Sequence, residues 1–256
     1  MIGIFQGRLS RAPRKKLQYF PKNWEKEFIL AKKLKYNFIE FFTEEKINKN
    51  NPIWSKLGIL KYKNKCKENN LKIICHCDNF IIANFFNEKK TIKYLSKLLK
   101  KLSILGVKNL TLPFYGKSYM NDKNYILFLK NLEYLIKDNK SNLNILIESD
   151  ISPEVFINIK RKLKTKKLKF LFDTGNRVNL NRNIYKDLII LNKHIGHVHL
   201  KDKNNKNINV PIGKGLVNFQ RVFNALKKIN YKKDFTFETP REENPLETAK
   251  KKQIIF

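Results

Sequence analysis

A regular alternation of short apolar runs with longer segments of helical periodicity constrains this chain most. Runs rich in Val, Ile, Leu and Phe are typical of strands that are buried on both faces of a parallel sheet. Because 256 residues suit one barrel of this kind, the pattern predicts an α/β fold, a single (β/α)8 barrel domain over residues 1–256. We place its eight strands at residues 2–5, 37–42, 71–77, 108–113, 143–148, 169–173, 195–200 and 234–239.

Helix end signals support this division of the chain. Residues 88–105 carry an apolar stripe with lysines largely opposite, and Gly106 follows in the usual C-terminal position. A serine, a proline and a glutamate open a predicted helix over 152–164. We expect Asn23 to cap a further helix over 24–35. The alternative fold, a doubly wound open sheet, lacks support because no Gly-rich dinucleotide fingerprint follows the first run.

The composition limits the partners of the chain. Its formal net charge of +32 suggests nucleic acid, but lysine outnumbers arginine 46 to 8, whereas phosphate and groove recognition favours arginine. We therefore attribute the charge mainly to a solvated surface and predict no specific nucleic-acid partner. No apolar run approaches the ~18 residues that span a bilayer, so we expect a cytoplasmic protein without a membrane partner.

The three cysteines, an odd number, predict no disulfide framework. Cys75 and Cys77 flank His76 in the run CHCD, which resembles a zinc motif. Neighbouring strand residues point to opposite faces, so these three side chains do not converge on one ion. We expect buried strand cysteines and an inward His76.

Four successive runs in the second half end on a residue that can bind a metal. Carboxyl ends of barrel strands meet at one mouth, and an inward acid within an apolar run is costly unless it is paired. The sequence therefore predicts one divalent-metal site held by Glu148, Asp173, His199 and Glu238. His197 shares a face with His199 but would lie one layer deeper, so His199 is the preferred ligand.

Each of these residues also has a simpler interpretation. A single acid at a strand end is more often a helix cap or a salt-bridge partner, and a single histidine there is more often a satisfied core residue. Four such positions at equivalent places in one barrel favour a shared site. Glu40 obeys the same inward rule on the second predicted strand.

Eight motifs run through the chain in a characteristic order: GIFQGRLS (3–10), FPKNWEKEF (20–28), FIEFF (38–42), ILIESD, FDTGN, HVHLKD, VPIGKG (210–215) and FETP. Their order and spacing resemble the sugar phosphate isomerase/epimerase superfamily, the xylose-isomerase-like barrels. This superfamily includes ketose 3-epimerases, inosose dehydratase and hydroxypyruvate isomerase, with endonuclease IV as a distant relative. The resemblance implies that the four residues hold one divalent metal and that Glu148 and Glu238 also form the acid–base pair.

The chain departs from the family pattern at several positions. Ketose epimerases usually carry a histidine where this chain has Asn176, and an arginine where Lys201 is the nearest cation. Asn207 and Asn209 stand in the loop where endonuclease IV needs further zinc ligands. The sequence therefore lacks the ligands that a three-zinc site needs, whereas the predicted ligand set for a single metal is complete.

The resemblance implies an isomerase that moves a proton next to a carbonyl through an enediolate, with the metal as Lewis acid. Mixed carboxylate and imidazole ligands favour Mn²⁺ and also suit Co²⁺, Mg²⁺ or Zn²⁺. The expected substrate is a small sugar or sugar phosphate, and nothing in the sequence indicates an oligomeric state. The alternatives are a dehydratase on the same site, an endonuclease IV-like phosphodiesterase and a metal-free binding barrel. Candidate substrate-binding residues are Gln6, Arg8, Glu40, His76, Asn176 and Lys201.

Overall fold

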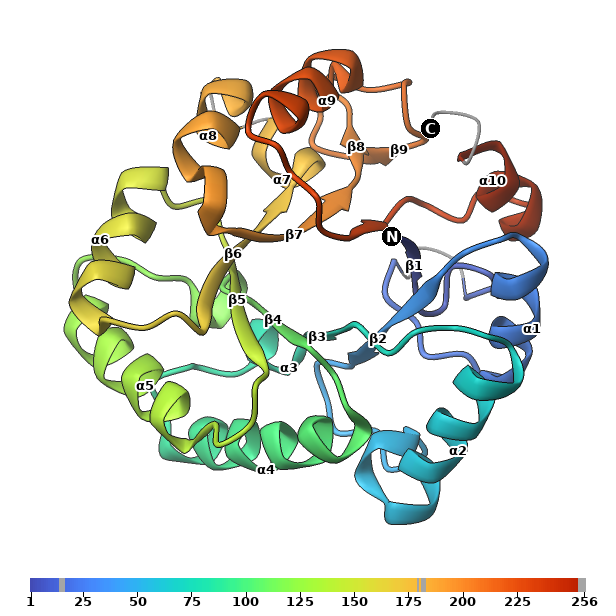
Figure 1. Cartoon of the computed structure of the whole chain (residues 1–256), viewed down its shortest axis with the longest axis horizontal. Coiled ribbons are helices and arrows are strands. Elements are labelled where there is room, and N and C mark those ends of the chain that lie inside the picture. Colours follow the sequence, from blue (N-terminus) through green and yellow to red (C-terminus); the bar gives the residue numbers. More distant parts are fainter. Residues whose placement is uncertain (14–16, 179, 181–182, 253–256) are drawn as a thin grey trace.

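The computed structural model describes residues 1–13, 17–178, 180 and 183–252. Within this part of the chain, parallel strands close into a barrel in the order β1-β10-β7-β6-β5-β4-β3-β2, with helices around the outside (Figure 1). The predicted (β/α)8 barrel is confirmed. No helix among the described residues is long and apolar enough to cross a membrane.

The eight predicted runs each overlap a barrel strand, although the third and the last strands are shorter than expected. Lys72 pairs with Phe38 only through an isolated bridge, so the third strand begins later. The last strand ends at Phe237, although Glu238 N still donates to Leu200 O at 3.1 Å. The strands are β1 (Ile2–Phe5), β2 (Phe38–Thr43), β3 (Cys75–Asp78), β4 (Asn109–Pro113), β5 (Asn144–Glu148), β6 (Leu168–Asp173), β7 (Ile195–Leu200) and β10 (Phe235–Phe237).

The helical segments follow the strands, and a short hairpin of β8 (Asp202–Lys203) and β9 (Asn209–Val210) interrupts the alternation after β7. The helices are α1 (Glu25–Lys33), α2 (Lys56–Glu68), α3 (Phe80–Ala83), α4 (Lys89–Leu105), α5 (Tyr125–Asp138), α6 (Pro153–Leu163), α7 (Thr174–Val178), α8 (Ile184–Leu191), α9 (Phe219–Lys228) and α10 (Pro245–Lys252). Short 3₁₀ turns lie at Pro52–Trp54, Gly116–Ser118 and Asn192–His194.

Two of the predicted helix boundaries are confirmed and one is wrong. Gly106 ends α4 at a φ of 89°, and Ser152 Oγ accepts from Val155 N at 3.2 Å at the start of α6. Asn23 does not cap α1 with its side chain. Its backbone carbonyl accepts from Lys26 N at 3.1 Å, so the chain enters α1 through a turn whose bonds involve backbone atoms alone.

Strand alternation creates two layers inside the molecule. The outward-facing residues Ile147, Phe172, Val198 and Phe237 are fully buried in the hydrophobic core between barrel and helices. Neighbouring residues in a strand point to opposite faces, so the residues next to these face inward. At the carboxyl ends of β5, β6 and β7 the inward-facing residues are the polar Glu148, Asp173 and His199. The helices and the apolar layer thus support a polar barrel mouth.

Candidate metal and acid–base site

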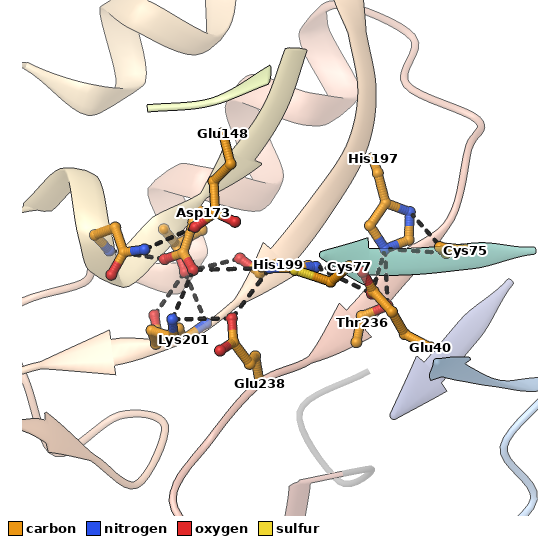
Figure 2. Close-up of polar contacts among 12 residues, drawn as sticks. Glu40, Cys75, Cys77, Glu148, Asp173, His197, His199, Lys201, Thr236 and Glu238 are labelled. Atoms are coloured by element: carbon orange, nitrogen blue, oxygen red, sulfur yellow. Dashed lines mark hydrogen bonds and ion pairs between the residues drawn. The ribbon is translucent and has the colours of Figure 1, made fainter. Parts of the chain in front are cut away.

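The ends of four neighbouring strands bring the four predicted ligands together. Glu148 ends β5, Asp173 ends β6, His199 lies near the end of β7, and Glu238 directly follows β10. One ligand atom each from Glu148, Asp173 and His199 lies within 4.8 Å of the others. Glu238 Oε2 lies 3.1 Å from Nδ1 of His199 (Figure 2). The closed barrel therefore produces the convergence that the sequence pattern predicts.

A lysine lies among these carboxylates. Lys201 Nζ is 3.0 Å from Asp173 Oδ2 and 2.9 Å from Glu238 Oε2, and all three side chains are buried. Burial lowers the pKa of Lys201, but the carboxylates of Asp173 and Glu238 outweigh it and hold the pKa above its ordinary value. The ammonium group offsets part of the negative charge in the site.

The two glutamates differ in their electrostatic surroundings. Burial, reinforced by the nearby Asp173 carboxylate, raises the pKa of Glu148 to about 7. Burial would also raise the pKa of Glu238, but Lys201 and His199 outweigh it and hold that pKa well below its ordinary value. One site thus contains a carboxyl that readily carries a proton and a second that stays ionised, a separation typical of acid–base pairs.

The loop after β6 supports the first two ligands. Asn176 Nδ2 donates to Glu148 Oε1 at 2.8 Å, and the backbone N–H of Asn176 donates to Asp173 Oδ1 at 2.7 Å. Asn176, predicted as a substrate contact, therefore lies at the site and orients two of its carboxylates.

The loop after β1 supports Glu238 from the other side. Gln18 Nε2 donates to Glu238 Oε1 at 2.7 Å, and Arg8 Nη2 lies 3.6 Å from the same oxygen. Arg8 also donates to Gln18 Oε1 at 3.0 Å and to Leu17 O. Its burial lowers its pKa to about 10. Gln18 is not among the residues predicted for the site, because a loop residue carries no strand-end signal.

A second polar layer lies beneath the mouth. Glu40 on β2 places its two carboxylate oxygens 3.1 and 3.0 Å from His199 Nε2. His197 Nε2 lies 3.3 Å from Glu40 Oε2 and 2.7 Å from Thr236 Oγ1. His199 rather than His197 therefore faces the other predicted ligands, in line with the preference from strand alternation.

Glu40, Cys75 and His197 form another group of donor atoms within 4.8 Å of one another. Its geometry does not suit a metal. Cys75 Sγ is 3.7 Å from His197 Nε2 and 3.9 Å from Nδ1, so the sulfur lies against the ring rather than along either nitrogen's lone pair. The hydroxyl of Thr236 already lies at hydrogen-bond distance from Nε2.

The predicted inward position of His76 is wrong. Cys75 contacts His197 in the barrel interior, so the alternation turns His76 toward the helices. Its Nε2 lies 3.1 Å from Thr43 Oγ1, and Thr43 in turn bonds to Asp78, which accepts from Tyr94 of α4. Burial lowers the pKa of His76 to about 3, so its ring is neutral.

Two further polar residues near the barrel have local partners. Gln6 Nε2 donates to the hydroxyl of Tyr62 on α2 at 3.4 Å, which places it beside that helix. Asp202, next to Lys201, accepts from the backbone N–H groups of Gly213 and Gly215, each at 2.9 Å. Asp202 thereby folds the VPIGKG loop back against the barrel.

The donor set determines what this site can hold. Three carboxylates and one imidazole are hard to borderline ligands, which suit Mn²⁺, Co²⁺, Mg²⁺ and Zn²⁺. Their burial makes a set of converging negative charges costly unless a cation offsets it. The residues present therefore fit one divalent cation.

Comparison with known proteins bears on the fold and the family of the chain. Residues 28–255 match a family model described as xylose isomerase-like TIM barrel. The chain is 25% identical over 252 residues to the L-ribulose-5-phosphate 3-epimerase UlaE of Salmonella heidelberg (strain SL476), covering 91% of this chain and 88% of the relative.

Solved structures share the fold at lower sequence identity. The D-psicose 3-epimerase of Clostridium cellulolyticum H10, solved with D-tagatose, superimposes with a TM-score of 0.78 at 13% identity, covering 100% of this chain and 97% of that chain. A structure of the IOLI protein with a binding zinc atom gives a TM-score of 0.75 at 16% identity, covering 99% and 96%.

Proposed function

The chain belongs to the xylose isomerase-like TIM barrel family, and we propose that it is a sugar epimerase or isomerase acting next to a carbonyl group. The relatives named by both comparisons include sugar epimerases, enzymes of the predicted isomerase class. The observation that carries the proposal is the pair of buried glutamates, Glu148 and Glu238, which converge with Asp173 and His199 on one set of possible ligand atoms.

The proposed cofactor is one divalent cation per chain, held by Glu148, Asp173, His199 and Glu238. Mn²⁺ is the preferred ion, and Co²⁺, Mg²⁺ or Zn²⁺ would suit the same ligands. When bound, such an ion would polarise the substrate's carbonyl and adjacent hydroxyl oxygens and acidify the neighbouring C–H.

The two glutamates then divide the proton transfer between them. Glu238, kept ionised by Lys201 and His199, accepts the proton from the carbon next to the carbonyl, which leaves an enediolate. Glu148, the other member of the pair, returns a proton to the enediolate. Return to the opposite face of the same carbon gives an epimer, and return to the neighbouring carbon gives an isomer.

The proposed substrate is a ketose or a ketose phosphate. The loops after β1 and β10 line a hollow of about 980 Å³ whose lining includes Arg11, Leu17 and Arg241. This volume is within the range of small-molecule sites. Leu17 O accepts from the buried Arg8, which lies 3.6 Å from Glu238, so one side chain connects the hollow with Glu238. Lys201 and Asn176 remain predicted substrate contacts at the mouth.

Solvent-deuterium exchange followed by NMR tests the proposal. The Mn²⁺-loaded protein, incubated in D₂O with a panel of ketoses and ketose phosphates, is expected to incorporate deuterium next to the carbonyl of one substrate and to form its epimer or aldose isomer. A dehydratase would instead release water from the same substrate. A lack of exchange across the panel, with metal bound, would contradict proton transfer at this site.

The charge of +32 is the one observation that favours a second function, a DNA-repair phosphodiesterase. We expect binding to duplex DNA to be weak, independent of sequence and reduced about 10³-fold or more between 50 and 200 mM salt, because dispersed lysines supply only phosphate contacts. Fluorescence anisotropy over a salt series measures this. Tight binding of an abasic-site duplex at physiological salt, with strand cleavage there, would favour the phosphodiesterase instead.

A further inference from the structure

We propose that Glu40 is a positioning residue of the candidate metal centre, where it fixes the imidazole of His199 so that Nδ1 is the ligand atom. The proposal rests on the cation site in the proposed function and assigns a role to the layer beneath it. It also replaces the substrate contact that the sequence pattern predicts for Glu40.

The two nitrogens of His199 face different partners. Nε2 lies 3.0 and 3.1 Å from the two oxygens of Glu40, on the inner side of the ring. Nδ1 lies 3.1 Å from Glu238 Oε2 and 3.9 Å from Asp173 Oδ2, on the side of the other proposed ligands (Figure 2). Because Glu40 accepts the Nε2 proton, the lone pair is left on Nδ1.

Glu40 is itself held in place from more than one direction. It reaches His199 across the barrel interior, since β1 and β10 lie between β2 and β7 in the sheet. His197 Nε2 lies 3.3 Å from Glu40 Oε2, and the Phe5 ring meets the His199 ring edge-on at 6.1 Å between centroids. The carboxylate and the imidazole therefore have little freedom to rotate.

A buried carboxylate with this geometry has a clear chemical use. Metal-binding histidines commonly donate their second N–H to a carboxylate, which sets the tautomer, orients the ring and makes the ligand nitrogen more basic. Glu40 is fully buried, and its oxygens are directed at Nε2 rather than at the cation side of the ring. We expect Glu40 to influence the cation only by holding His199, without binding the cation itself.

The test compares Glu40→Leu, Glu40→Gln and the control Thr43→Val by titration calorimetry with Mn²⁺. We expect Glu40→Leu to weaken Mn²⁺ binding about 10- to 100-fold. Glu40→Gln keeps an oxygen that can accept from Nε2, so it should restore part of the affinity. Thr43→Val removes a partner of His76 on the helix side of the barrel wall and should bind Mn²⁺ with wild-type affinity. Circular dichroism checks that each variant is folded.

A second measurement uses the wild-type protein and so does not depend on any variant folding. Long-range ¹H–¹⁵N NMR of the Zn²⁺-loaded protein should show His199 protonated at Nε2 and bound through Nδ1. Coordination through Nε2, or folded Glu40→Leu with wild-type Mn²⁺ affinity, would overturn the role of Glu40 alone. Wild-type protein that binds neither ion would instead overturn the proposed cation site, and the role of Glu40 with it.

Discussion

Replacing Glu148 or Glu238 by glutamine is expected to lower kcat about 10²- to 10⁴-fold, the usual cost of losing one acid–base partner. Glutamine keeps an oxygen that can bind the cation but cannot accept the substrate proton. Both variants should therefore retain part of their metal while losing turnover. Steady-state kinetics with metal analysis of the same samples measures the two effects separately.

The two variants should also differ from each other. If the glutamates flank the reacting carbon, each variant keeps one of them and can still exchange the substrate proton with solvent from one face only. Deuterium exchange with each member of the epimer pair distinguishes the two faces. Glu68→Gln, an exposed change at the end of α2, serves as the control. Metal-loaded variants with near wild-type turnover would disprove this mechanism.

Replacing Asp173 by alanine is expected to abolish stoichiometric metal binding while leaving the barrel folded. Asp173 supplies one of the proposed ligands, orients the turn into α7 through Asn176 N, and lies 3.0 Å from Lys201 Nζ. The substitution removes one ligand and one negative charge. The ammonium of Lys201 then offsets a larger share of the negative charge on the remaining carboxylates, which weakens the attraction for a cation. Metal analysis after dialysis, together with far-UV circular dichroism, measures both outcomes.

Asp122→Ala is a suitable comparison, because Asp122 is an exposed acid in the segment before α5. It should retain one ion per chain. Full occupancy in folded Asp173→Ala would remove Asp173 from the ligand set. An anomalous-scattering peak at Cys75 and Cys77 in place of the barrel mouth would contradict the whole assignment.

The sequence by itself determined the barrel and the position of its polar mouth. Strands buried on both faces produce apolar runs that are visible without any tertiary information, and their repetition between helices specifies the fold class. Glu148 and Asp173 stand out because each ends such a run, where a charge is costly unless a function or a partner requires it. Parallel strands then bring those ends together at one mouth.

Only the tertiary structure decided which face of a strand looks inward and which distant residues meet. In a strand buried on both faces, either phase of the alternation is apolar, so the pattern CHCD could not show that Cys75 rather than His76 enters the barrel. Barrel closure brings Glu40 to His199, 159 residues away, and Gln18 to Glu238, 220 residues away. These partners depend on register and loop path, which no local periodicity encodes.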